Sequence, residues 1–411
     1  MFDSDDIKTS LFGKFRKLSE RVDTLRVSGR LPFGLQMDEM LSQTRARIGN
    51  REVLLAGTNN YLGLTFDADV MEAAKSAIDA QGTATTGSRL ANGSYAAHLD
   101  LEERLKAYFE VPSAIVCTTG YQANLASISA LAGRGDHLLL DADSHACIYD
   151  AARLSDADTI RFRHNSPADL DKRLSRLPKE GGRLVVIEGL YSMFGDVAPV
   201  AEFVEVAHAH GAMLFVDEAH SVGCYGARGR GVAQAQGVAD KVDFISGTFS
   251  KSFASIGGFC VSRHVELELI RMVSRPYLFT ASGSPSNVAA AQAALAKIAG
   301  EPQLRQALWD RVHQLYGGLT EAGFEPISPA APIIAIPRPD EQVAVAEWNR
   351  LMDAGVYVNL AVPPATPQSK SLLRLSVSAA HSEADIDEVL AGFRSLLEDG
   401  APALSMAASG T

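Results

Sequence analysis

The sequence predicts an α/β protein with a mostly parallel sheet covered by helices on both faces, followed by a smaller C-terminal α+β domain. In the middle of the 411-residue chain, short continuous apolar runs alternate with segments of helical spacing. Such runs, separated by helices, are typical of parallel strands buried on both faces. Beyond about residue 290 the pattern changes to two long helical segments, several short strands and a closing helix, which is typical of an α+β unit.

Each apolar run of the central part ends in polar residues. Ligands of open α/β sheets bind at the carboxyl ends of the strands, so the residues that follow the runs are the first candidates for a site. The connections 121–133 and 145–155 have helical spacing. The strands are predicted within 113–120, 137–143, 183–189, 212–220 and 243–250, and the candidate polar residues lie at 120–121, 145, 188–192, 217–220 and 248–251.

The flanking segments predict the rest of the organisation. Segment 10–25 places Leu11, Phe15, Leu18, Val22 and Leu25 on one helical stripe. We favour a helix packed on its own protein or on a dimer partner over one at a membrane surface. Further helices are predicted at 287–300, 304–323 and 382–399, and strands at 332–338, 355–361 and 372–378. We expect an N-terminal helix and arm over 1–55, a large domain over 56–290, a small domain over 291–400 and a disordered tail over 401–411.

Composition narrows the class of function. The net charge of −11 argues against a nucleic-acid partner. No apolar run approaches the roughly 20 residues of a membrane-spanning helix, and no signal-peptide pattern opens the sequence. The four cysteines are scattered without a C-x-x-C pair, which indicates a reduced protein. We expect a cytoplasmic location, with the inner face of the membrane as the alternative if the N-terminal helix binds lipid.

The stretch VDEAHS, 216–221, has two competing interpretations. DEAH also occurs in helicases, but their ATP site requires a G-x-x-x-x-G-K-[ST] loop. In the nearest candidate, GTFSKS, Ser250 stands before Lys251 where that loop requires glycine. A metal site needs a compact set of ligands, and no further His or Cys lies at a useful spacing. We therefore expect no metal, although the available ligands would be Asp217, His220 and His145.

Lys251 follows a buried strand, and a lysine there is costly unless it is paired or used. Burial lowers the pKa of the amine and frees its lone pair, which suits a Schiff base. Pyridoxal 5'-phosphate (PLP) requires such a lysine and a carboxylate for its pyridinium nitrogen. Asp217 ends another predicted strand and can supply that carboxylate. We therefore expect PLP as the cofactor.

The other groups that PLP needs follow neighbouring strands. Gly120 and Tyr121 begin a predicted helix, whose free N–H groups and dipole favour a phosphate. Thr248 can add a hydroxyl, His145 can stack on the ring, and His220 can reach the phenolic oxygen. A single histidine after a strand more often has a structural role than a catalytic one. The prediction of a PLP site therefore depends on all of these residues occurring together, each after a predicted strand.

Five stretches carry a family resemblance: TTGYQAN, DADSHACIYD, IEGLYSMFGD, VDEAHSVG and GTFSKSFASIGG. They resemble the α-oxoamine synthases, which are fold-type I PLP enzymes. RFRHNSPADLDKRLSRLPKE, TTGSRLANGSY and PPATP further resemble the bacterial serine palmitoyltransferases within that family. The similarity runs from about Leu54 to the final helix. It implies a fold-type I PLP-dependent transferase with a mostly parallel seven-stranded central sheet.

The resemblance also implies the reaction. L-serine and a long-chain acyl thioester, palmitoyl-CoA, would condense with loss of CO2 and free thiol to give 3-ketodihydrosphingosine, the first step of sphingolipid synthesis. Coenzyme A and an acyl carrier protein both stay open as the carrier. Members of the family are dimers with active sites at the subunit interface, so a homodimer is implied.

The family's motifs assign roles to positions of this sequence. Lys251 matches the Schiff-base lysine, Asp217 the pyridinium aspartate and His145 the stacking histidine. Ser192 is expected to assist His220 at the phenolic oxygen. The phosphate contacts match Gly120, Tyr121, Ser246 and Thr248, with Thr280 matching the residue that reaches the phosphate of the partner subunit.

The substrate carboxylate is expected to meet Asn60 and Arg374. Alternation within 372–378 puts Arg374 on one face with two serines, and an arginine fork suits a carboxylate. Without the resemblance, an arginine held in a salt bridge on a strand is an equal alternative.

Two positions depart from the serine palmitoyltransferase pattern. Val362 precedes PPATP where those enzymes have an arginine, and Asn59 precedes Asn60 where they have a tyrosine. Both departures bear on substrate choice. The alternatives are therefore an α-oxoamine synthase that uses glycine or alanine with a different acyl thioester, and a non-catalytic homologue that keeps the fold.

Overall fold

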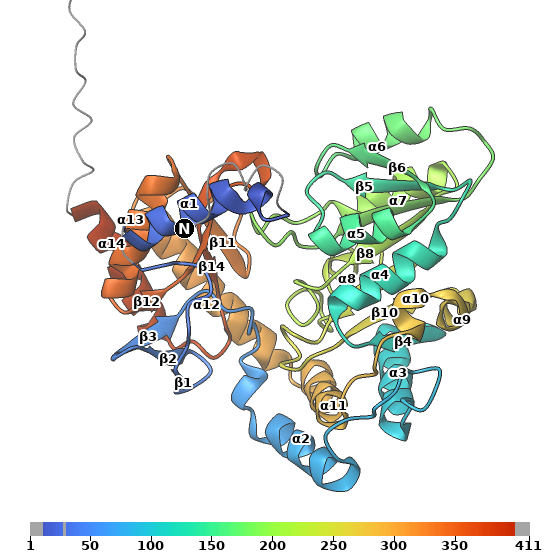
Figure 1. The fold of residues 1–411 in the computed structure, drawn as a ribbon, viewed down its shortest axis with the longest axis horizontal. Helices are drawn as coiled ribbons and strands as arrows, with labels where there is room; N and C mark the ends of the chain where they lie inside the picture. Colours follow the sequence, from blue (N-terminus) through green and yellow to red (C-terminus); the bar gives the residue numbers. More distant parts are fainter. Residues whose placement is uncertain (1–10, 28–29, 399–411) are drawn as a thin grey trace, which may run out of the picture.

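The structure, a computed structural model, describes residues 11–27 and 30–398, which form two lobes (Figure 1). The strands of the larger lobe are β4 (Ser113–Cys117), β5 (His137–Asp141), β6 (Asp158–Phe162), β7 (Arg183–Glu188), β8 (Met213–Asp217), β9 (Phe244–Thr248) and β10 (Gly258–Ser262). They form one sheet in the order β4-β10-β9-β8-β7-β5-β6. β10 is antiparallel to both neighbours and the other pairs are parallel. The predicted mostly parallel seven-stranded sheet is confirmed.

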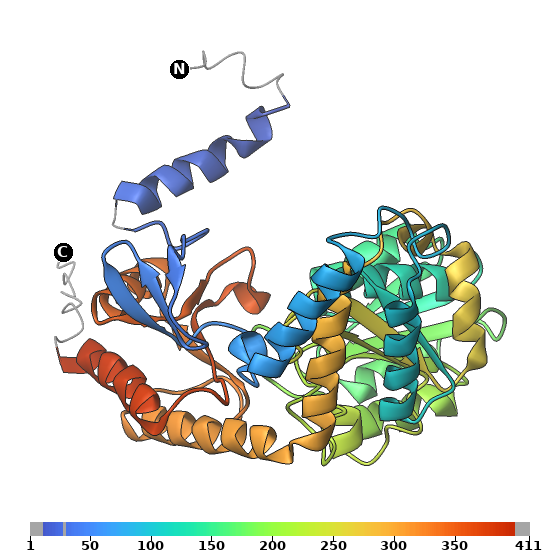
Figure 2. The ribbon, with the colours of Figure 1, turned by 90° about the horizontal axis from the view of Figure 1, so that it is seen from below.

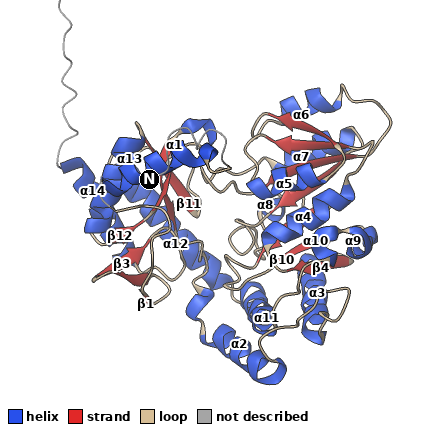
Figure 3. Cartoon of the chain, in the orientation of Figure 1, coloured by secondary structure: helices blue, strands red, loops and turns tan. Residues whose placement is uncertain are grey.

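Helices cover both faces of this sheet (Figure 3), because alternate strand residues point to opposite sides. Leu138 and Leu140 of β5 pack in a cluster with residues of α4 (Gly120–Leu131) and α5 (Ala146–Leu154). Leu139, between them, packs in the main core with residues of α7 (Val200–Ala209). The other helical elements before the smaller lobe are η2 (Leu64–Phe66), α2 (Ala68–Gln81), α3 (Ala96–Phe109), α6 (Pro167–Leu174), α8 (Val232–Ala235), η3 (Val265–Leu269), α9 (Ile270–Val273) and α10 (Arg275–Leu278).

Two strands of the sheet were not predicted. β6 lies at the edge of the sheet, and most of its residues are exposed, so the segment lacks a continuous apolar run. β10 is completely buried, but it begins at Gly258, directly after a second glycine. A Cβ at Gly258 would lie 2.5 Å from the backbone nitrogen of Gly120. Glycine is therefore required there, because the strand passes against the first turn of α4.

The smaller lobe combines two sheets. β11 (Ile333–Arg338), β14 (Ser371–Ser376) and β13 (Asn359–Ala361) form an antiparallel one. The other has the order β1 (Glu39–Met40), β2 (Arg45–Ile48), β3 (Arg51–Leu55) and β12 (Val356–Tyr357), in which β3 and β12 are parallel. Residues 39–55 therefore share a sheet with the C-terminal part of the chain. The domain boundaries after 55 and 290 stay a prediction.

Long helices complete the smaller lobe and join it to the larger one. α11 (Pro285–Gly300) packs along α2, and α12 (Pro302–Glu321) lies beside α14 (Glu383–Glu398) (Figure 2). α13 (Glu341–Asp353) and the short η4 (Pro367–Ser369) are the remaining helical elements of this region.

The N-terminal segment begins as the short helix η1 (Gly13–Phe15) and continues as α1 (Arg16–Val27). Of the predicted stripe, Leu11 and Leu18 are exposed, and the side chain of Leu25 lies outside the described residues. Arg21 forms an ion pair with Glu341 of α13 at 2.6 Å. None of the helices within 11–27 and 30–398 is long and apolar enough to cross a membrane. The predicted tail over 401–411 also lies outside the described residues.

Candidate active site

Four of the predicted residues meet at the edge formed by the carboxyl ends of β5, β8 and β9. Asp217 ends β8, His220 follows it, His145 follows β5, and Lys251 follows β9. All four line a cavity of about 270 Å³. The rule that strand ends converge on one edge of a parallel sheet therefore located this cavity from the sequence.

Lys251 has the electrostatic environment of a reactive amine. Burial lowers the pKa of its amine from 10.5 to about 8, against the opposing effect of the nearby carboxyl groups of Asp217 and Glu188. An amine with such a pKa has an appreciable neutral fraction near pH 7. The neutral form has the free lone pair that nucleophilic attack and proton abstraction both require.

Asp217 is buried, and both of its carboxylate oxygens are held. Oδ2 accepts a hydrogen bond from Asn124 Nδ2 at 2.6 Å, and Oδ1 accepts one from the backbone nitrogen of Ala219 at 2.9 Å. Asn124 Nδ2 also lies 3.1 Å from the sulfur of Cys147. The sequence analysis did not assign Asn124 a role. Its signal was a polar residue four positions after Gly120, hence on the same face of the helix.

His145 is held in place from two sides. Its Nδ1 accepts from the backbone nitrogen of Cys147 at 3.2 Å and so caps α5, and its own backbone nitrogen donates to Glu188 Oε1 at 2.5 Å. Burial lowers the pKa of the imidazole; Asp217 opposes this shift and Lys251 adds to it. A neutral ring is suited to stacking on a flat group.

Glu188 lay among the candidate polar residues but received no role. It ends β7 directly beside Asp217, which ends β8. Burial raises the pKa of its carboxyl well above the ordinary value, and the charge of Asp217 adds to this shift. Because of its bond to the His145 backbone, it positions that histidine at the cavity.

The first turn of α4, where the sequence predicts an anion cradle, borders the 270 Å³ cavity. The Thr119 side chain accepts from Gln122 N at 3.0 Å, whereas the backbone N–H groups of Gly120 and Tyr121 have no partner among the described residues. A Cβ at Gly120 would lie 2.6 Å from Thr248 Cβ, so only glycine lets the helix start this close to β9. The Thr248 hydroxyl lies 2.8 Å from that of Ser250, which the sequence analysis did not assign.

Some predicted residues lie elsewhere. Ser246 does not line the 270 Å³ cavity, and its buried hydroxyl has no partner among the described residues. Tyr121 lines the cavity, while its hydroxyl hydrogen-bonds Asp150. Thr280 lies outside this cavity and accepts a hydrogen bond from Gln122 Nε2 at 3.1 Å. Thr280 therefore does not line the cavity that contains Lys251 of its own chain.

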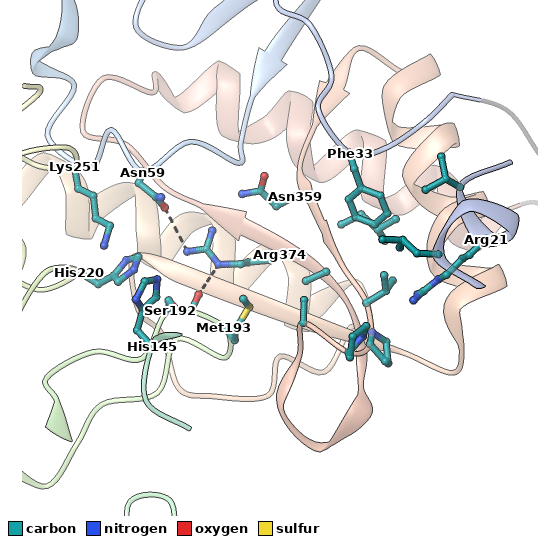
Figure 4. A pocket seen from close by; sticks show the side chains of 18 residues that line it. Arg21, Phe33, Asn59, His145, Ser192, Met193, His220, Lys251, Asn359 and Arg374 are labelled. Atoms are coloured by element: carbon teal, nitrogen blue, oxygen red, sulfur yellow. Dashed lines mark hydrogen bonds between the residues drawn. The ribbon is translucent and has the colours of Figure 1, made fainter. Parts of the chain in front are cut away.

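A second cavity of about 610 Å³ adjoins the first, and Lys251, His145 and His220 line both. Arg374 of β14 reaches its polar end (Figure 4). The Arg374 guanidinium donates to the backbone oxygen of Ser192 at 2.6 Å and to Ser376 Oγ at 3.0 Å. These bonds fix the fork of the arginine at the wall of the cavity.

Asn59 and Asn60 point in different directions. Asn59 lines the large cavity, and its Oδ1 accepts from Arg374 Nη2 at 3.3 Å (Figure 4). Asn60 does not line it, because its Nδ2 donates to Thr65 Oγ1 at 2.8 Å. The position expected for Asn60, beside Arg374, is therefore occupied by Asn59.

The far end of the large cavity is apolar apart from Arg21, and residues of the N-terminal helix line it. Arg21 of α1 and Phe33 lie there, at the end opposite Lys251 (Figure 4). The apolar lining comprises Leu18, Val22, Phe33, Met193, Leu360 and Val362. The site thus joins a polar, reactive end to a long apolar compartment.

Comparison with known proteins agrees with this geometry. Residues 51–393 match the family model of aminotransferase class I and II. The serine palmitoyltransferase of Caulobacter vibrioides is 51% identical over 381 residues, which cover 92% of this chain and 94% of that protein. The serine palmitoyltransferase of Sphingomonas paucimobilis is 47% identical over 397 residues, which cover 95% and 94%.

Solved structures show the same fold. A high-resolution structure of SPT with a PLP internal aldimine superposes with a TM-score of 0.93 at 46% identity, over 95% of this chain and 99% of that chain. Sphingomonas wittichii serine palmitoyltransferase superposes with a TM-score of 0.92 at 49% identity, over 95% and 98%. The predicted resemblance and the fold-type I architecture are therefore confirmed. This chain belongs to the aminotransferase class I and II family and, within it, to the α-oxoamine synthases that include the bacterial serine palmitoyltransferases.

Proposed function

We propose that this chain is a PLP-dependent acyltransferase that condenses L-serine with a long-chain acyl thioester, palmitoyl-CoA, and releases CO2 and the free thiol. The product would be 3-ketodihydrosphingosine, from the first step of sphingolipid synthesis. The observation that carries the proposal is that Lys251, His145 and His220 line both cavities. The reactive amine therefore adjoins an apolar compartment large enough for a lipid chain, and relatives named serine palmitoyltransferase support this reaction.

PLP fits the smaller cavity group by group. The unpartnered N–H groups at the start of α4, with Thr248 and Ser250, suit its phosphate. Asp217, fixed by Asn124, suits its ring nitrogen, and the Lys251 amine suits its aldehyde. When bound, PLP supplies an electron sink for negative charge at the amino acid α-carbon.

Lys251 is the residue that moves the proton at the α-carbon. A general base works best when its pKa lies near the working pH, and the pKa of this amine is about 8. His145 lines both cavities, so its ring can stack on the cofactor while it holds the substrate carboxylate. Glu188 holds the backbone of His145 in that position.

Arg374 and Asn59 are proposed to bind the serine carboxylate. Arg374 presents a charged fork at the cavity wall, and Asn59 lies against its Nη2. The acyl chain is proposed to lie along the apolar lining, between β13 and α1. Each buried CH2 group contributes about 0.8 kcal/mol, so a long chain gains more there than a short one.

The test is an assay of the purified, PLP-loaded protein with serine, glycine and alanine against acyl thioesters of graded length. Carbon dioxide release and mass spectrometry of the aminoketone report the reaction. We expect serine with a C16 thioester to give the highest kcat/KM, and Lys251→Ala to give no product. A preference for glycine or alanine with a short thioester would overturn the proposed substrates. Acyl-CoA and acyl carrier protein are assayed in parallel to identify the carrier.

The alternative substrates have one specific observation in their favour. Val362 lines the large cavity and is buried, so the arginine expected there is replaced by an apolar wall. If that position sets amino-acid choice, glycine or alanine would be preferred. A non-catalytic homologue would leave Lys251, Asp217 and His145 unused. The absence of a PLP band in the visible absorption spectrum of the purified protein would support that role.

We further propose a homodimer. The segment before Thr280 exposes large apolar side chains, with Leu269 64%, Met272 63% and Phe279 80% exposed. Several large apolar side chains exposed along one short segment are typical of protein–protein contacts. Thr280 lies next to this surface and is proposed to reach the phosphate in the site of the partner.

The proposed location is the cytoplasm, and contact of the N-terminal helix with the inner face of the membrane is the alternative. The segment 11–17 exposes Leu11, Phe12 and Phe15 together with Lys14 and Lys17, a combination that suits an anionic lipid surface. Co-sedimentation with anionic vesicles tests this contact, with zwitterionic vesicles as the control. Protein that stays in the supernatant with both would contradict it.

A further inference from the structure

Tyr61 is a buried tyrosine that the proposed chemistry does not use, although it touches the site. Its side chain is fully buried, and its hydroxyl oxygen lies 2.7 Å from Nδ1 of His220. The two rings meet edge to face, with centroids 6.1 Å apart. The other nitrogen of His220, Nε2, has no hydrogen-bond partner in 11–27 and 30–398, and the ring lines both cavities. One nitrogen is therefore bound by the protein and the other is left for a ligand.

His220 has one proton to place on its two nitrogens. Burial lowers the pKa of the imidazole well below its ordinary value, and the charges of Lys251, Arg374 and His145 act in the same direction. Burial also raises the pKa of the Tyr61 phenol, which therefore keeps its proton. The neutral pair can share the 2.7 Å contact in two ways: Tyr61 donates to Nδ1, or Nδ1–H donates to Tyr61.

The distances favour Tyr61 as the donor. Hydroxyl donors form bonds with a usual length near 2.7–2.8 Å, whereas N–H donors to oxygen lie near 2.9–3.0 Å. If Nδ1–H were the donor, the Tyr61 proton would have to go to Asn59 Oδ1, which lies 3.3 Å away. That distance is beyond the usual range of an O–H donor, and the same oxygen already accepts from Arg374.

We propose that Tyr61 is a positioning residue that donates to Nδ1 of His220 and so holds its proton on Nε2, as a donor directed at the cofactor. A bare Nε2 would present a lone pair to the phenolic oxygen of PLP, whereas Nε2–H binds that oxygen. This inference rests on the proposed function, because the phenolic oxygen belongs to PLP. It adds a part for Tyr61 that does not depend on which amino acid or acyl chain is used.

The test compares Tyr61→Phe with a matched control, Tyr225→Phe. Tyr225 also has a buried hydroxyl, but this hydroxyl has no hydrogen-bond partner among the described residues, so its removal breaks no bond. Two-bond 1H–15N NMR of 15N-histidine protein, with and without PLP, reports which ring nitrogen carries the proton. The His220 signal is assigned by its loss in His220→Asn.

We expect the wild type to show Nε2–H at His220 near neutral pH, and Tyr61→Phe to show an unbonded Nδ1 with a mixture of tautomers. PLP affinity and kcat should each fall about fivefold in Tyr61→Phe, the value of one ordinary hydrogen bond, with KM for the acyl thioester unchanged. In Tyr225→Phe, the PLP affinity, kcat and KM for the acyl thioester should all stay within twofold of the wild-type values.

An Nδ1–H tautomer in the wild type would overturn the inference, and so would an unchanged His220 spectrum in Tyr61→Phe. The wild-type spectrum needs no variant to fold, and it needs no turnover. Failure of serine condensation alongside the expected spectra would count against the proposed substrates and leave the role of Tyr61 standing.

Discussion

Lys251 shows how a single buried amine trades stability for reactivity. The unfolded chain keeps this lysine charged up to about pH 10.5, whereas the cofactor-free fold keeps it charged only up to about pH 8. Between these values the unfolded state binds more protons, so the free energy of unfolding rises with pH across this window. Below pH 8 the full cost of burying the cation is present.

Lys251→Met should therefore stabilise the cofactor-free protein at pH 7 by up to about 3 kcal/mol. The gain should shrink as the pH rises from 8 towards 10.5. Urea unfolding at several pH values measures it, and exposed Lys241→Met is the control. A Lys251→Met protein no more stable than wild type at pH 7 would show that the amine carries no burial cost.

Asn59 and Asn60 form a natural matched pair, because they are adjacent and identical in type but differ in direction. Asn59→Ala removes the group beside Arg374, so KM for the amino acid should rise about fivefold while stability changes little. Asn60→Ala removes a bond to Thr65, so it should lower stability by about 1 kcal/mol and leave KM unchanged. Steady-state kinetics measures KM for each variant, and thermal unfolding measures its stability. If Asn60→Ala raised KM and Asn59→Ala lowered stability, the substrate role would belong to Asn60.

The residues found from the sequence and those missed differ in how they reach the site. Lys251, Asp217 and His145 follow buried strands, so the strand pattern alone brought them together. Tyr61 reaches the site through its contact with His220, 159 positions further along the chain, which no local pattern encodes. Asn124 has a local signal in its helix position, but its partner Asp217 lies 93 positions further along the chain. Ser250 directly precedes Lys251, but nothing in the sequence around a functional lysine indicates that the preceding residue has a role.

The start of α4 depends on a close approach that only glycine allows. Gly120→Ala would place a methyl group 2.6 Å from Thr248 Cβ, and either the helix or β9 must then retreat. We expect the affinity for PLP to fall at least about tenfold, because a displaced cradle loses its geometry. Gly133→Ala, just after the same helix, meets no atom within 4 Å and should bind PLP normally. Titration followed by absorbance measures both, and equal affinities would contradict the cradle.

α1 is proposed to close the apolar compartment. Leu18 lines the large cavity, whereas Ser19 is an exposed neighbour that does not. Leu18→Glu should raise KM for a C16 thioester about tenfold, because a charge would face the chain, and should leave a short thioester unaffected. Ser19→Glu adds the same charge one position away as a control. Equal effects of the two variants would mean that α1 acts through charge alone.

The elements were predictable where their signal was local. The run 183–189 matched a strand because buried parallel strands are continuously apolar, and 372–378 matched one because its residues alternate in the way that strand residues do. β6 was missed because most of its residues are exposed and it has no such run, and the pairing of β3 with β12 was missed because its partners lie about 300 residues apart. Pairing over that distance depends on how the two ends of the chain fold onto each other.

The whole molecule brings two lobes together around one site. The larger lobe supplies Lys251, Asp217 and the cradle, and the smaller lobe supplies Arg374 and much of the apolar lining. Arg374 connects them through its bond to Ser192 of the larger lobe. The groups proposed to hold the cofactor and those proposed to bind the substrate therefore come from different parts of the fold.

Thr280 is a predicted site residue that does not line the Lys251 cavity of its own chain, which makes the oligomeric state testable through the cofactor. Phe279→Asp places a charge on the proposed contact surface beside it, so we expect a monomer in analytical ultracentrifugation together with weaker PLP binding. Thr280→Ala should stay dimeric and lose about fivefold in PLP affinity, the value of one hydrogen bond. Leu154→Asp, at a side chain 59% exposed on α5, is the control and should change neither. If Phe279→Asp stays dimeric with full PLP affinity, the surface before Thr280 is not the subunit contact, and if Thr280→Ala keeps full PLP affinity, Thr280 has no part in holding the phosphate of the partner.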